Sequence, residues 1–459
     1  MKILYYSFEF PPFQAGGLGT YAQEMAKRFV RKDHSVTVFS KNPGDATTSE
    51  TWRGVEVHRP LLADMIDLLP IIMPGDVANW AESSQNYFAE VLMYNILSAT
   101  KTVNELVGKD ERDFDIIVGH DWLSGIAGIS AQRSLDKPFV FHIHSTEQGR
   151  TDNGSDTVKS LERTAGRKAD IIITVSDAMK GHLISLGYEP SKIRAVPNGV
   201  DHEKYDPNRE EFSDEKVKEF REKIGVGDDP MILFVGRLTW VKGVVPLVKA
   251  MPKILEEVPD AKLVILGVGD QEDSINNIID KNDLQDNVIT NYEFVDEEER
   301  LMYYASCDLS VFPSKYEPFG LVCTEAMSMG KPVVVHSRDA EKQVMEILGE
   351  YELESVVMHC FNGSPELAEK AVKRGCYISV STQILYSKRV KNIVERVSSD
   401  KILLETDSPF LYPGDERNSP VNVHKSLEKI SEIKGSEKEV LGEQFNTNTR
   451  KAYLSALDD

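Results

Sequence analysis

The chain has 459 residues, with 53 basic and 74 acidic side chains and a formal net charge of −21. This length allows about two or three domains with full hydrophobic cores. The acidic balance argues against nucleic acid as a partner, because non-specific binding to DNA or RNA needs a basic face that displaces counterions.

The cysteine usage and the N-terminal stretch indicate a cytoplasmic protein. None of the four cysteines lies in a C-x-x-C pair, so we expect them to be reduced and buried. The first residues, MKILYYSFEFPP, hold one lysine and too short an apolar run for a signal peptide. No apolar run approaches the length of a membrane span, and we predict none.

Buried strands alternate with helices over the first 200 residues. This alternation predicts a parallel α/β sheet that is covered on both faces. Ligands of such sheets bind at the carboxyl ends of the strands, where His120, Asp121, His144 and Ser176 are expected. Strands are predicted at residues 2–7, 34–40, 114–119, 139–142 and 171–175.

A glycine-rich loop, FEFPPFQAGGLGT, follows the first predicted strand and leads into a helix. This arrangement points backbone N–H groups and a helix N-terminus at an anion. Gly16 and Gly17 allow the backbone to approach a phosphate or a sugar closely. A tight turn without a ligand is the alternative interpretation.

Two histidines, His142 and His144, flank one residue at the end of the strand predicted at 139–142. In a regular strand both side chains point to the same face, as two ligands of a metal ion would. The sequence shows no third ligand near them. A polar ligand contact and ordinary packing therefore remain as alternatives.

A polar segment over residues 201–229, rich in lysine and glutamate, is predicted to link two domains. About eight further buried runs follow from Met231 onward and predict a second series of βα units. Arg237 follows the first of these strands, and Lys242 comes five residues later. The two cations suit a diphosphate leaving group that gathers negative charge, although solvated surface cations are the alternative.

Six motifs in residues 1–335 point to one family: FEFPPFQAGGLGT, HIHSTE, ADIIITVSDAMK, IRAVPNGVD, FVGRLTWVKG and EPFGLVCTEAMSMGKPVV. With them this part of the chain resembles the retaining, glycogen-synthase-like glycosyltransferases of the GT-B fold. The resemblance implies two Rossmann-like domains, at residues 1–215 and 216–335. It also implies a nucleotide-sugar donor, UDP-glucose or ADP-glucose, and an α-glucan or other saccharide acceptor.

The same resemblance implies a set of site residues. His144, Arg237, Lys242 and Glu317 would be catalytic, with His144 facing the sugar from the first domain. Glu317 would bind the sugar hydroxyls, and Glu325 the ribose diol, since a carboxylate accepts hydrogen bonds from two hydroxyls. A pair of carboxylates stabilised by a helix N-terminus is the alternative. The remaining donor-binding residues would be Gly16, Gly17, Phe319, Gly320 and Leu321.

After Val335 the motifs change to PVVVHSRDAEK, HCFNGSPELAEKAVKRGCYISVS, KILLETDSPFLYP and RNSPVNVHKSLEKI. With them residues 332–456 resemble the second half of the TatD-type metal-dependent hydrolases, which are (βα)8 barrels that act on DNA. The resemblance implies that His336, His359 and Asp407 ligate a divalent metal, with Glu405 and Arg338 beside them. The family's other ligands belong to the missing half, so a single weakly held ion and a remnant without metal are both open.

The fold class that follows is α/β, with two Rossmann-like domains, the second completed or extended by a half barrel over residues 336–459. In a Rossmann series the first strand lies beside the fourth, so it cannot close a barrel. We therefore predict an open sheet that the barrel-derived strands extend. A glycosyltransferase is the main functional prediction. A metal-dependent phosphodiesterase and a catalytically silent hybrid are the alternatives.

Overall fold

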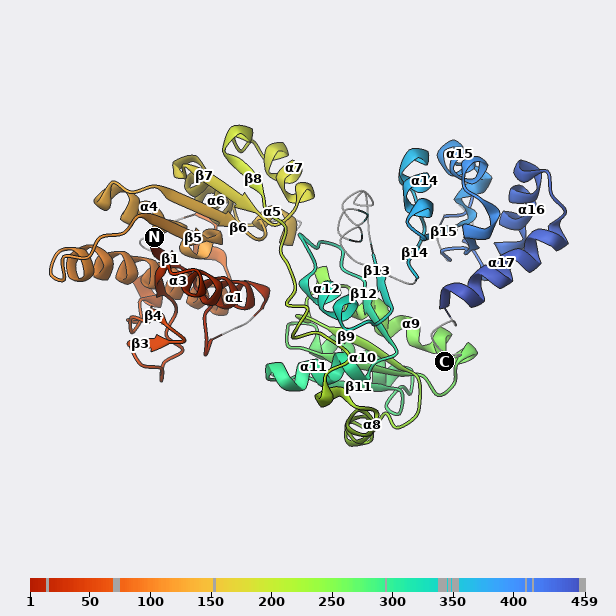
Figure 1. Cartoon of the computed structure of the whole chain (residues 1–459), viewed down its shortest axis with the longest axis horizontal. Helices are drawn as coiled ribbons and strands as arrows, with labels where there is room; N and C mark the ends of the chain where they lie inside the picture. Colours follow the sequence, from red (N-terminus) through yellow and green to blue (C-terminus); the bar gives the residue numbers. More distant parts are fainter. Residues whose placement is uncertain are drawn as a thin grey trace. The chain divides into compact units, whose positions relative to one another are not determined.

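A computed structural model describes residues 1–13, 16–68, 75–151, 154–293, 295–336, 345, 348, 355–408, 411–414 and 417–453. Its internal contacts divide the chain into two compact units (Figure 1). Unit 1 consists of Met1–Val200 and Tyr316–Leu321, and unit 2 of Asp201–Lys315 and Val322–Asp459. Arg338, which the sequence analysis placed beside a metal, lies outside the described residues.

Unit 1 is built on one eight-stranded sheet with the order β3-β4-β2-β1-β5-β6-β7-β8. All neighbouring strands of this sheet pair in parallel except β3 and β4. The five strands predicted for this part of the chain are confirmed. The bounds are β1 Lys2–Tyr6, β2 Ser35–Phe39, β3 Ser49–Trp52, β4 Val55–His58, β5 Ile116–His120, β6 Phe139–Ile143, β7 Ile171–Thr174 and β8 Ile193–Ala195.

The β3–β4 hairpin was not predicted from the sequence. Its two-residue turn consists of Arg53 and Gly54, which have φ values of +48° and +84°. Two consecutive residues with positive φ are typical of the type I′ turn that matches the twist of a hairpin. Because the first turn residue is an arginine, the usual Asn-Gly or Asp-Gly signal is absent.

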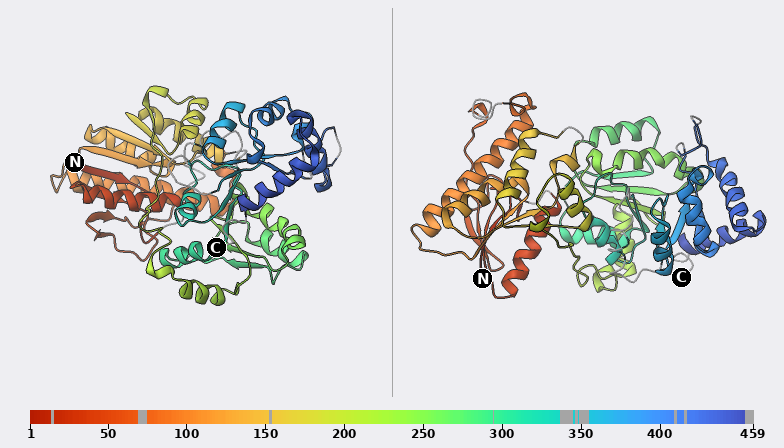
Figure 2. Two further views of the ribbon diagram at one scale, coloured as in Figure 1. Left: turned by 45° about the vertical axis from the view of Figure 1, so that its right-hand side comes forward. Right: turned by 90° about the horizontal axis from the view of Figure 1, so that it is seen from above.

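Helices cover both faces of this sheet (Figure 2). Leu4 and Tyr6 of β1 belong to a core that includes side chains of α3 and α4, whereas Ile3 and Tyr5 pack with Ala22 of α1. This is the doubly covered arrangement that the sequence predicts. The helices of unit 1 are α1 Gly17–Arg31, α3 Glu82–Lys101, α4 Asp121–Leu135, α5 Glu147–Arg150, α6 Asp156–Lys168 and α7 Asp177–Ser185.

The first sheet of unit 2 is parallel and five-stranded, with the order β11-β10-β9-β12-β13. The first strand of this series, β9, lies between β10 and the fourth strand, β12, as the sequence analysis predicted. The strands are β9 Met231–Val235, β10 Lys262–Leu266, β11 Val288–Asn291, β12 Leu309–Phe312 and β13 Val333–Val335. The helices are α8 Asp214–Lys223, α9 Val244–Glu257, α10 Glu272–Lys281, α11 Glu297–Ser306 and α12 Leu321–Ser328.

The three later strands form a separate parallel sheet, β14-β15-β16. The prediction that they extend the preceding sheet is therefore wrong for the described strands, and these strands form no closed barrel. The reason is that Ile378, Ile402 and Ile430 lie in a core that this part of the chain completes by itself. The elements are β14 Val357–Met358, α14 Pro365–Lys373, β15 Tyr377–Val380, α15 Lys388–Arg396, β16 Ile402–Leu404, α16 Val423–Lys434 and α17 Lys438–Tyr453.

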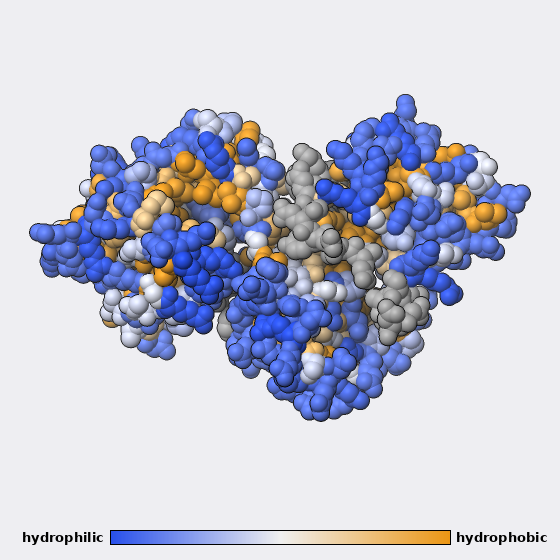
Figure 3. All heavy atoms as spheres, in the orientation of Figure 1, coloured by the Kyte–Doolittle hydropathy of each residue, from blue (hydrophilic) through white to orange (hydrophobic). Residues whose placement is uncertain are grey.

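The surface agrees with the composition. Among the helices that the structure describes, none is long and apolar enough to cross a membrane. The face drawn in Figure 3 is mainly hydrophilic, as expected for a chain in which 28% of residues are charged.

Candidate active site

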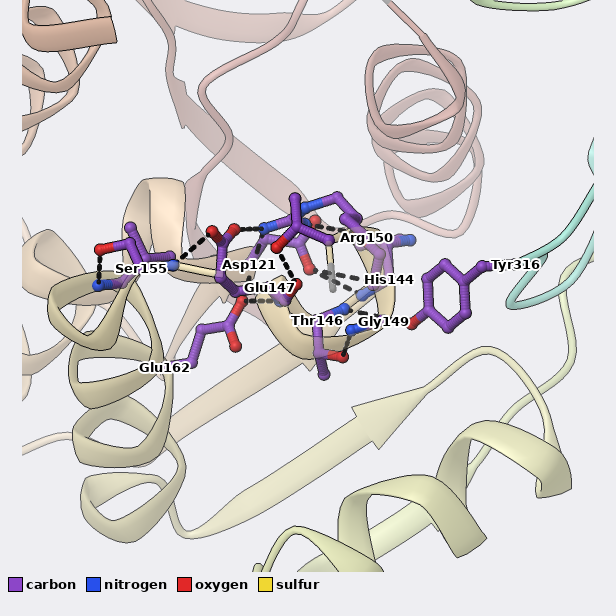
Figure 4. Close-up of polar contacts among 12 residues, drawn as sticks. Asp121, His144, Thr146, Glu147, Gly149, Arg150, Ser155, Glu162 and Tyr316 are labelled. Carbon is purple, nitrogen blue, oxygen red and sulfur yellow. Dashed lines mark hydrogen bonds and ion pairs between the residues drawn. The ribbon is translucent and has the colours of Figure 1, made fainter. Parts of the chain in front are cut away.

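The turn after β6 carries His144, and a dense set of polar contacts holds it in place (Figure 4). The Asp121 carboxylate accepts the backbone N–H of His144 at 2.7 Å and that of Ser145 at 3.4 Å. Asp121 is 5% exposed and has a φ of +51°, a left-handed conformation that costs about 1–2 kcal/mol outside glycine. This buried carboxylate fixes the direction in which the backbone leaves the strand.

Arg150 supports the same turn from the end of α5. Its guanidinium donates to Ser145 Oγ at 2.6 Å and lies 3.1 Å from a Glu147 carboxylate oxygen and 3.6 Å from a Glu162 one. The Glu162 carboxyl also accepts the backbone N–H of Glu147 at 2.9 Å. Burial raises the pKa of Glu162 to about 8, although the Arg150 charge opposes the shift. The Glu162 carboxyl is therefore mostly protonated at neutral pH.

Tyr316, which comes much later in the chain, packs directly on this turn (Figure 4). Its hydroxyl accepts the backbone N–H of Thr146 at 3.3 Å. A Cβ atom built at Gly149 would lie 2.2 Å from the Tyr316 ring, so only glycine fits at that position. The ring of Tyr316 therefore packs directly on the backbone of Gly149.

The residues after Tyr316 continue this contact with unit 1. The Ser176 hydroxyl donates to the Pro318 carbonyl at 2.7 Å, and the Phe319 side chain packs against the unit 1 core. Glu317, which lies between Tyr316 and Pro318 in the chain, is exposed. Gly320 has a φ of +92° and comes directly before α12, which begins at Leu321. Of the predicted donor residues, Glu317, Phe319, Gly320 and Leu321 thus belong with His144 to unit 1.

The predicted glycine loop lies at the N-terminus of α1. Gly16 precedes the helix in an extended conformation, and a Cβ atom at Gly17 would make only an ordinary contact, 3.5 Å from Leu321 Cδ1. Packing within unit 1 therefore does not require a glycine at Gly17. The N–H of Gly19 donates to a carboxylate oxygen of Glu9 at 3.2 Å. A carboxylate of this chain thus already lies at the helix N-terminus that the sequence predicts as an anion site.

The predicted cations lie in unit 2, in the loop after β9. Arg237 is exposed and forms no ion pair with any residue that the structure describes. Its loop is fixed to the loop after β10, because the Leu238 N–H donates to the Val268 carbonyl at 2.8 Å. A Cβ atom at Gly267 would lie 1.9 Å from the Gly236 carbonyl oxygen. This backbone-to-backbone contact holds Arg237 on a rigid loop.

Lys242 ends a short 3-10 turn, Trp240–Lys242, that leads into α9, and its side chain is half-buried. Gly243 follows with a φ of +72°, and a Cβ atom there would lie 2.1 Å from the Pro313 carbonyl oxygen. The Lys315 N–H donates to the Val241 carbonyl at 2.7 Å, so the loops after β9 and β12 are joined as well. Arg237 and Lys242 therefore both follow the carboxyl end of β9.

Glu325, the predicted ribose ligand, lies on α12 and is only 6% exposed. The Tyr304 hydroxyl donates to its carboxylate at 2.9 Å. Burial raises the pKa of Tyr304, and the Glu325 charge adds to the rise. Arg300 and Tyr205 are electrostatic partners of the same carboxylate. Glu325 is thus part of a buried polar cluster of unit 2.

The predicted metal ligands are only partly brought together. His359 follows β14 and Asp407 follows β16, with His359 Nε2 3.5 Å from Asp407 Oδ1 and Glu405 in contact with His359 Nδ1. Hydrogen bonds with Asp407 and then Glu405 raise the pKa of His359 to about 10. His359, Glu405 and Asp407 therefore form one polar cluster at the carboxyl ends of β14 and β16. His336 is exposed, and its charge helps His359 to lower the pKa of Asp407.

Four contributors to the His144 turn were missed by the sequence analysis: Gly149, Arg150, Glu162 and Tyr316. Nothing in the local pattern of the first three marks them, since α5 and α6 read as ordinary polar surface helices. One signal was available for Glu162 alone. It lies four residues after Val158 and three before Ala165, and this helical spacing places its carboxyl on the buried, apolar face of α6.

Three families match the chain. Glycosyltransferase Family 4 matches residues 15–204, and glycosyl transferases group 1 matches residues 216–373. The TatD related DNase family matches residues 309–454. The last two matches overlap at residues 309–373, a stretch that includes β13.

Relatives support each part. An uncharacterised glycosyltransferase of Methanocaldococcus jannaschii is 32% identical over 412 residues, which cover 88% of this chain and 97% of the relative. A glycogen synthase of Mycobacterium tuberculosis is 29% identical over 349 residues, covering 73% of this chain and 77% of the relative. An uncharacterised metal-dependent hydrolase of M. jannaschii is 35% identical over 133 residues, 29% of this chain and 53% of the relative. The chain thus spans about half of that hydrolase.

Solved structures confirm the fold of the larger part. The catalytic domain of starch synthase IV from Arabidopsis thaliana matches with a TM-score of 0.55 at 20% identity, over 72% of this chain and 82% of that one. The Anabaena protein HepE, solved with UDP-glucose, matches with a TM-score of 0.56 at 17% identity, over 98% of both chains. The chain belongs to the glycosyltransferases, with domains of the GT-B type fused to a TatD-type segment.

Proposed function

We propose that this protein is a retaining glycosyltransferase that moves a glucosyl group from UDP-glucose or ADP-glucose to an α-glucan acceptor. The observation that carries the proposal is the rigid presentation of Arg237 at the carboxyl end of β9, with Lys242 after it. A guanidinium fork and an ammonium point charge are the groups that stabilise a departing diphosphate. The glycogen synthase relative, the starch synthase IV structure with ADP and acarbose, and the HepE structure with UDP-glucose support this choice of donor and acceptor.

In the proposed reaction, the bond between the sugar anomeric carbon and the diphosphate oxygen breaks, and the acceptor hydroxyl oxygen forms the new bond on the same face. The proton of that hydroxyl goes to the leaving diphosphate. Arg237 and Lys242 neutralise the diphosphate, Glu325 binds the ribose, and Glu317 and His144 contact the sugar. No protein nucleophile is assigned, so positioning and leaving-group stabilisation supply the catalysis.

The test is calorimetric titration of UDP-glucose and ADP-glucose into the full chain and into Arg237→Ala. Loss of one charge-assisted contact with phosphate should weaken binding by roughly 10- to 100-fold. Arg450→Ala is the matched control, because Arg450 is an exposed arginine of α17 that is not among the predicted donor-binding residues. The control should bind the donor as the unchanged chain does.

Glucosyl transfer to an α-glucan, followed with labelled donor, then tests the reaction itself. Product with the α configuration supports the proposal, and β product would exclude the retaining reaction. Donor binding without any transfer would favour the silent hybrid. No binding of either donor would refute the assignment.

A further inference from the structure

Three histidines lie together on one face of the unit 1 sheet. His120, the last residue of β5, pairs in register with His142 of β6, so the two side chains point to the same face. His144 comes two residues after His142 and returns to that face. The ring of Tyr5 lies 4.5 Å from that of His120, which identifies the face as the one that α1 covers.

The three imidazoles are in mutual contact. His120 Nδ1 and His144 Nε2 are 2.9 Å apart, and the rings of His142 and His144 are stacked with centroids 4.1 Å apart. One nitrogen from each ring lies within 4.8 Å of the others. The Tyr21 ring of α1 packs on all three imidazoles. Three nitrogen donors therefore converge beneath one aromatic side chain.

Two nitrogens of this cluster lack a partner. His120 Nε2 and His142 Nε2 are buried and form no hydrogen bond with any described residue. Both side chains are almost completely buried, with exposures of 0% and 3%. Burying a polar atom without a partner costs stability, so the partnerless Nε2 of His142, beside the pair of His120 Nδ1 and His144 Nε2, indicates an interaction that the protein atoms do not supply.

The chemistry of the cluster also suits a metal ion, because a neutral imidazole donates a nitrogen lone pair to a metal. The Asp121 carboxylate, bound to the backbone N–H of His144, supplies negative charge nearby.

We propose that His120, His142 and His144 bind one divalent transition-metal ion, with zinc as the expected occupant. Three neutral imidazoles with a fourth position open form a donor set that zinc accepts, whereas magnesium and calcium prefer oxygen ligands. Zinc–nitrogen bonds of about 2.0–2.1 Å in a tetrahedron place the nitrogens roughly 3.3 Å apart. His120 Nδ1 and His144 Nε2, which lie 2.9 Å apart, are close to that spacing.

The ion also has a consequence for transfer, which rests on the proposed function. His144 is the group of unit 1 that the proposed reaction brings to the sugar. When its Nε2 binds a metal, that nitrogen no longer contacts a sugar hydroxyl. Bound zinc therefore inhibits transfer, and removal of zinc by a chelator restores it.

The direct test is titration of Co²⁺ into metal-free full-length protein, followed by displacement with Zn²⁺. Co²⁺ in a four-coordinate site of three imidazoles is expected to give an intense visible absorption band. His142→Phe removes one donor and keeps a ring of similar size, so it should abolish the band and weaken zinc binding more than tenfold. His359→Gln is the matched control, because it removes the imidazole that lies between Glu405 and Asp407, and it should keep the band.

Circular dichroism and thermal unfolding show whether each variant is folded, and His120→Gln replaces His142→Phe if the latter is not. An unchanged band in the folded variant, or no band in the unchanged chain, would overturn the site. Transfer that zinc does not alter in the unchanged chain would overturn the inhibitory role. Metal binding in a chain without any transfer would refute the proposed function and leave the metal site standing.

Discussion

Replacement of Gly149 by alanine tests how the Tyr316–Leu321 segment is seated in unit 1. The added Cβ atom would lie 2.2–2.5 Å from three atoms of the Tyr316 side chain, so the ring must move by about 1 Å to reach ordinary contact. Overpacking of this kind costs about 1–3 kcal/mol. The hydrogen bond from the Thr146 N–H would also be lost, at about 1 kcal/mol. The higher helix propensity of alanine offsets about 1 kcal/mol of this loss in stability.

Gly149→Ala should therefore destabilise the protein by about 1–3 kcal/mol, measured as a lower urea midpoint by circular dichroism. Because Glu317 follows Tyr316 directly, binding of UDP-glucose should weaken as well. Gly181→Ala is the matched control, since a Cβ atom at this α7 position meets nothing within 4 Å. That change should be neutral or slightly stabilising.

A double-mutant cycle with Tyr316→Ala decides whether the clash is the cause. Tyr316→Ala alone lowers stability, because the packing of a large, half-buried ring is lost. In its background, Gly149→Ala should cost nothing or stabilise slightly. If Gly149→Ala remains as destabilising there as in the unchanged chain, the steric argument is wrong and the loss arises elsewhere.

Three further predictions concern other parts of the molecule. Because the pKa of Glu162 is raised from 4.5 to about 8, its contribution to stability is complete below pH 4.5 and falls, by up to about 1.4 kcal/mol per pH unit, as the pH rises to 8. In urea titrations, Glu162→Gln should flatten the dependence of unfolding free energy on pH. An unchanged dependence would contradict the assignment. Gly267→Ala should destabilise by more than about 2 kcal/mol in urea unfolding, while Gly375→Ala, which has positive φ but open space, should cost only about 1 kcal/mol. The Asn448 side-chain amide donates to the carbonyls of Ser399 and Ile402, at 2.8 Å each. Asn448→Ala leaves both carbonyls without this donor, so it should lower the free energy of unfolding by about 1–3 kcal/mol and speed hydrogen exchange in α17. Unchanged exchange would refute this prediction.

The five central strands of unit 1 and the neighbours of β9 could be predicted from the sequence, because these buried runs are long enough to mark strands and the Rossmann order fixes which strands adjoin. The separate sheet of β14, β15 and β16 could not be predicted in this way. An apolar run shows that a strand is buried, but it does not show which sheet buries it. Here the apolar side chains of α14 to α17 complete a separate core, which only the packing reveals.

The candidate site shows the same limit at the level of single residues. His142 and His144 could be paired from their spacing, since alternation along one strand is a local property. His120 joins them only because β5 and β6 pair in one particular register, and that register cannot be predicted from the sequence of either strand alone. The contact of Gly149 with Tyr316 is harder still to predict, because these residues are far apart in the chain and no periodicity relates them.

The seating of Tyr316–Leu321 in unit 1 means that the chain passes between the units three times: after Val200, before Tyr316 and after Leu321. A protease that cuts once in residues 201–229 would break only one of these passages. The two fragments should stay associated on a sizing column and separate only in denaturant. A recombinant fragment of residues 1–200 would lack Phe319, which packs against the unit 1 core, so apolar side chains of that core would be exposed to solvent. Fragments for crystallisation or complementation should therefore carry residues 316–321 as well.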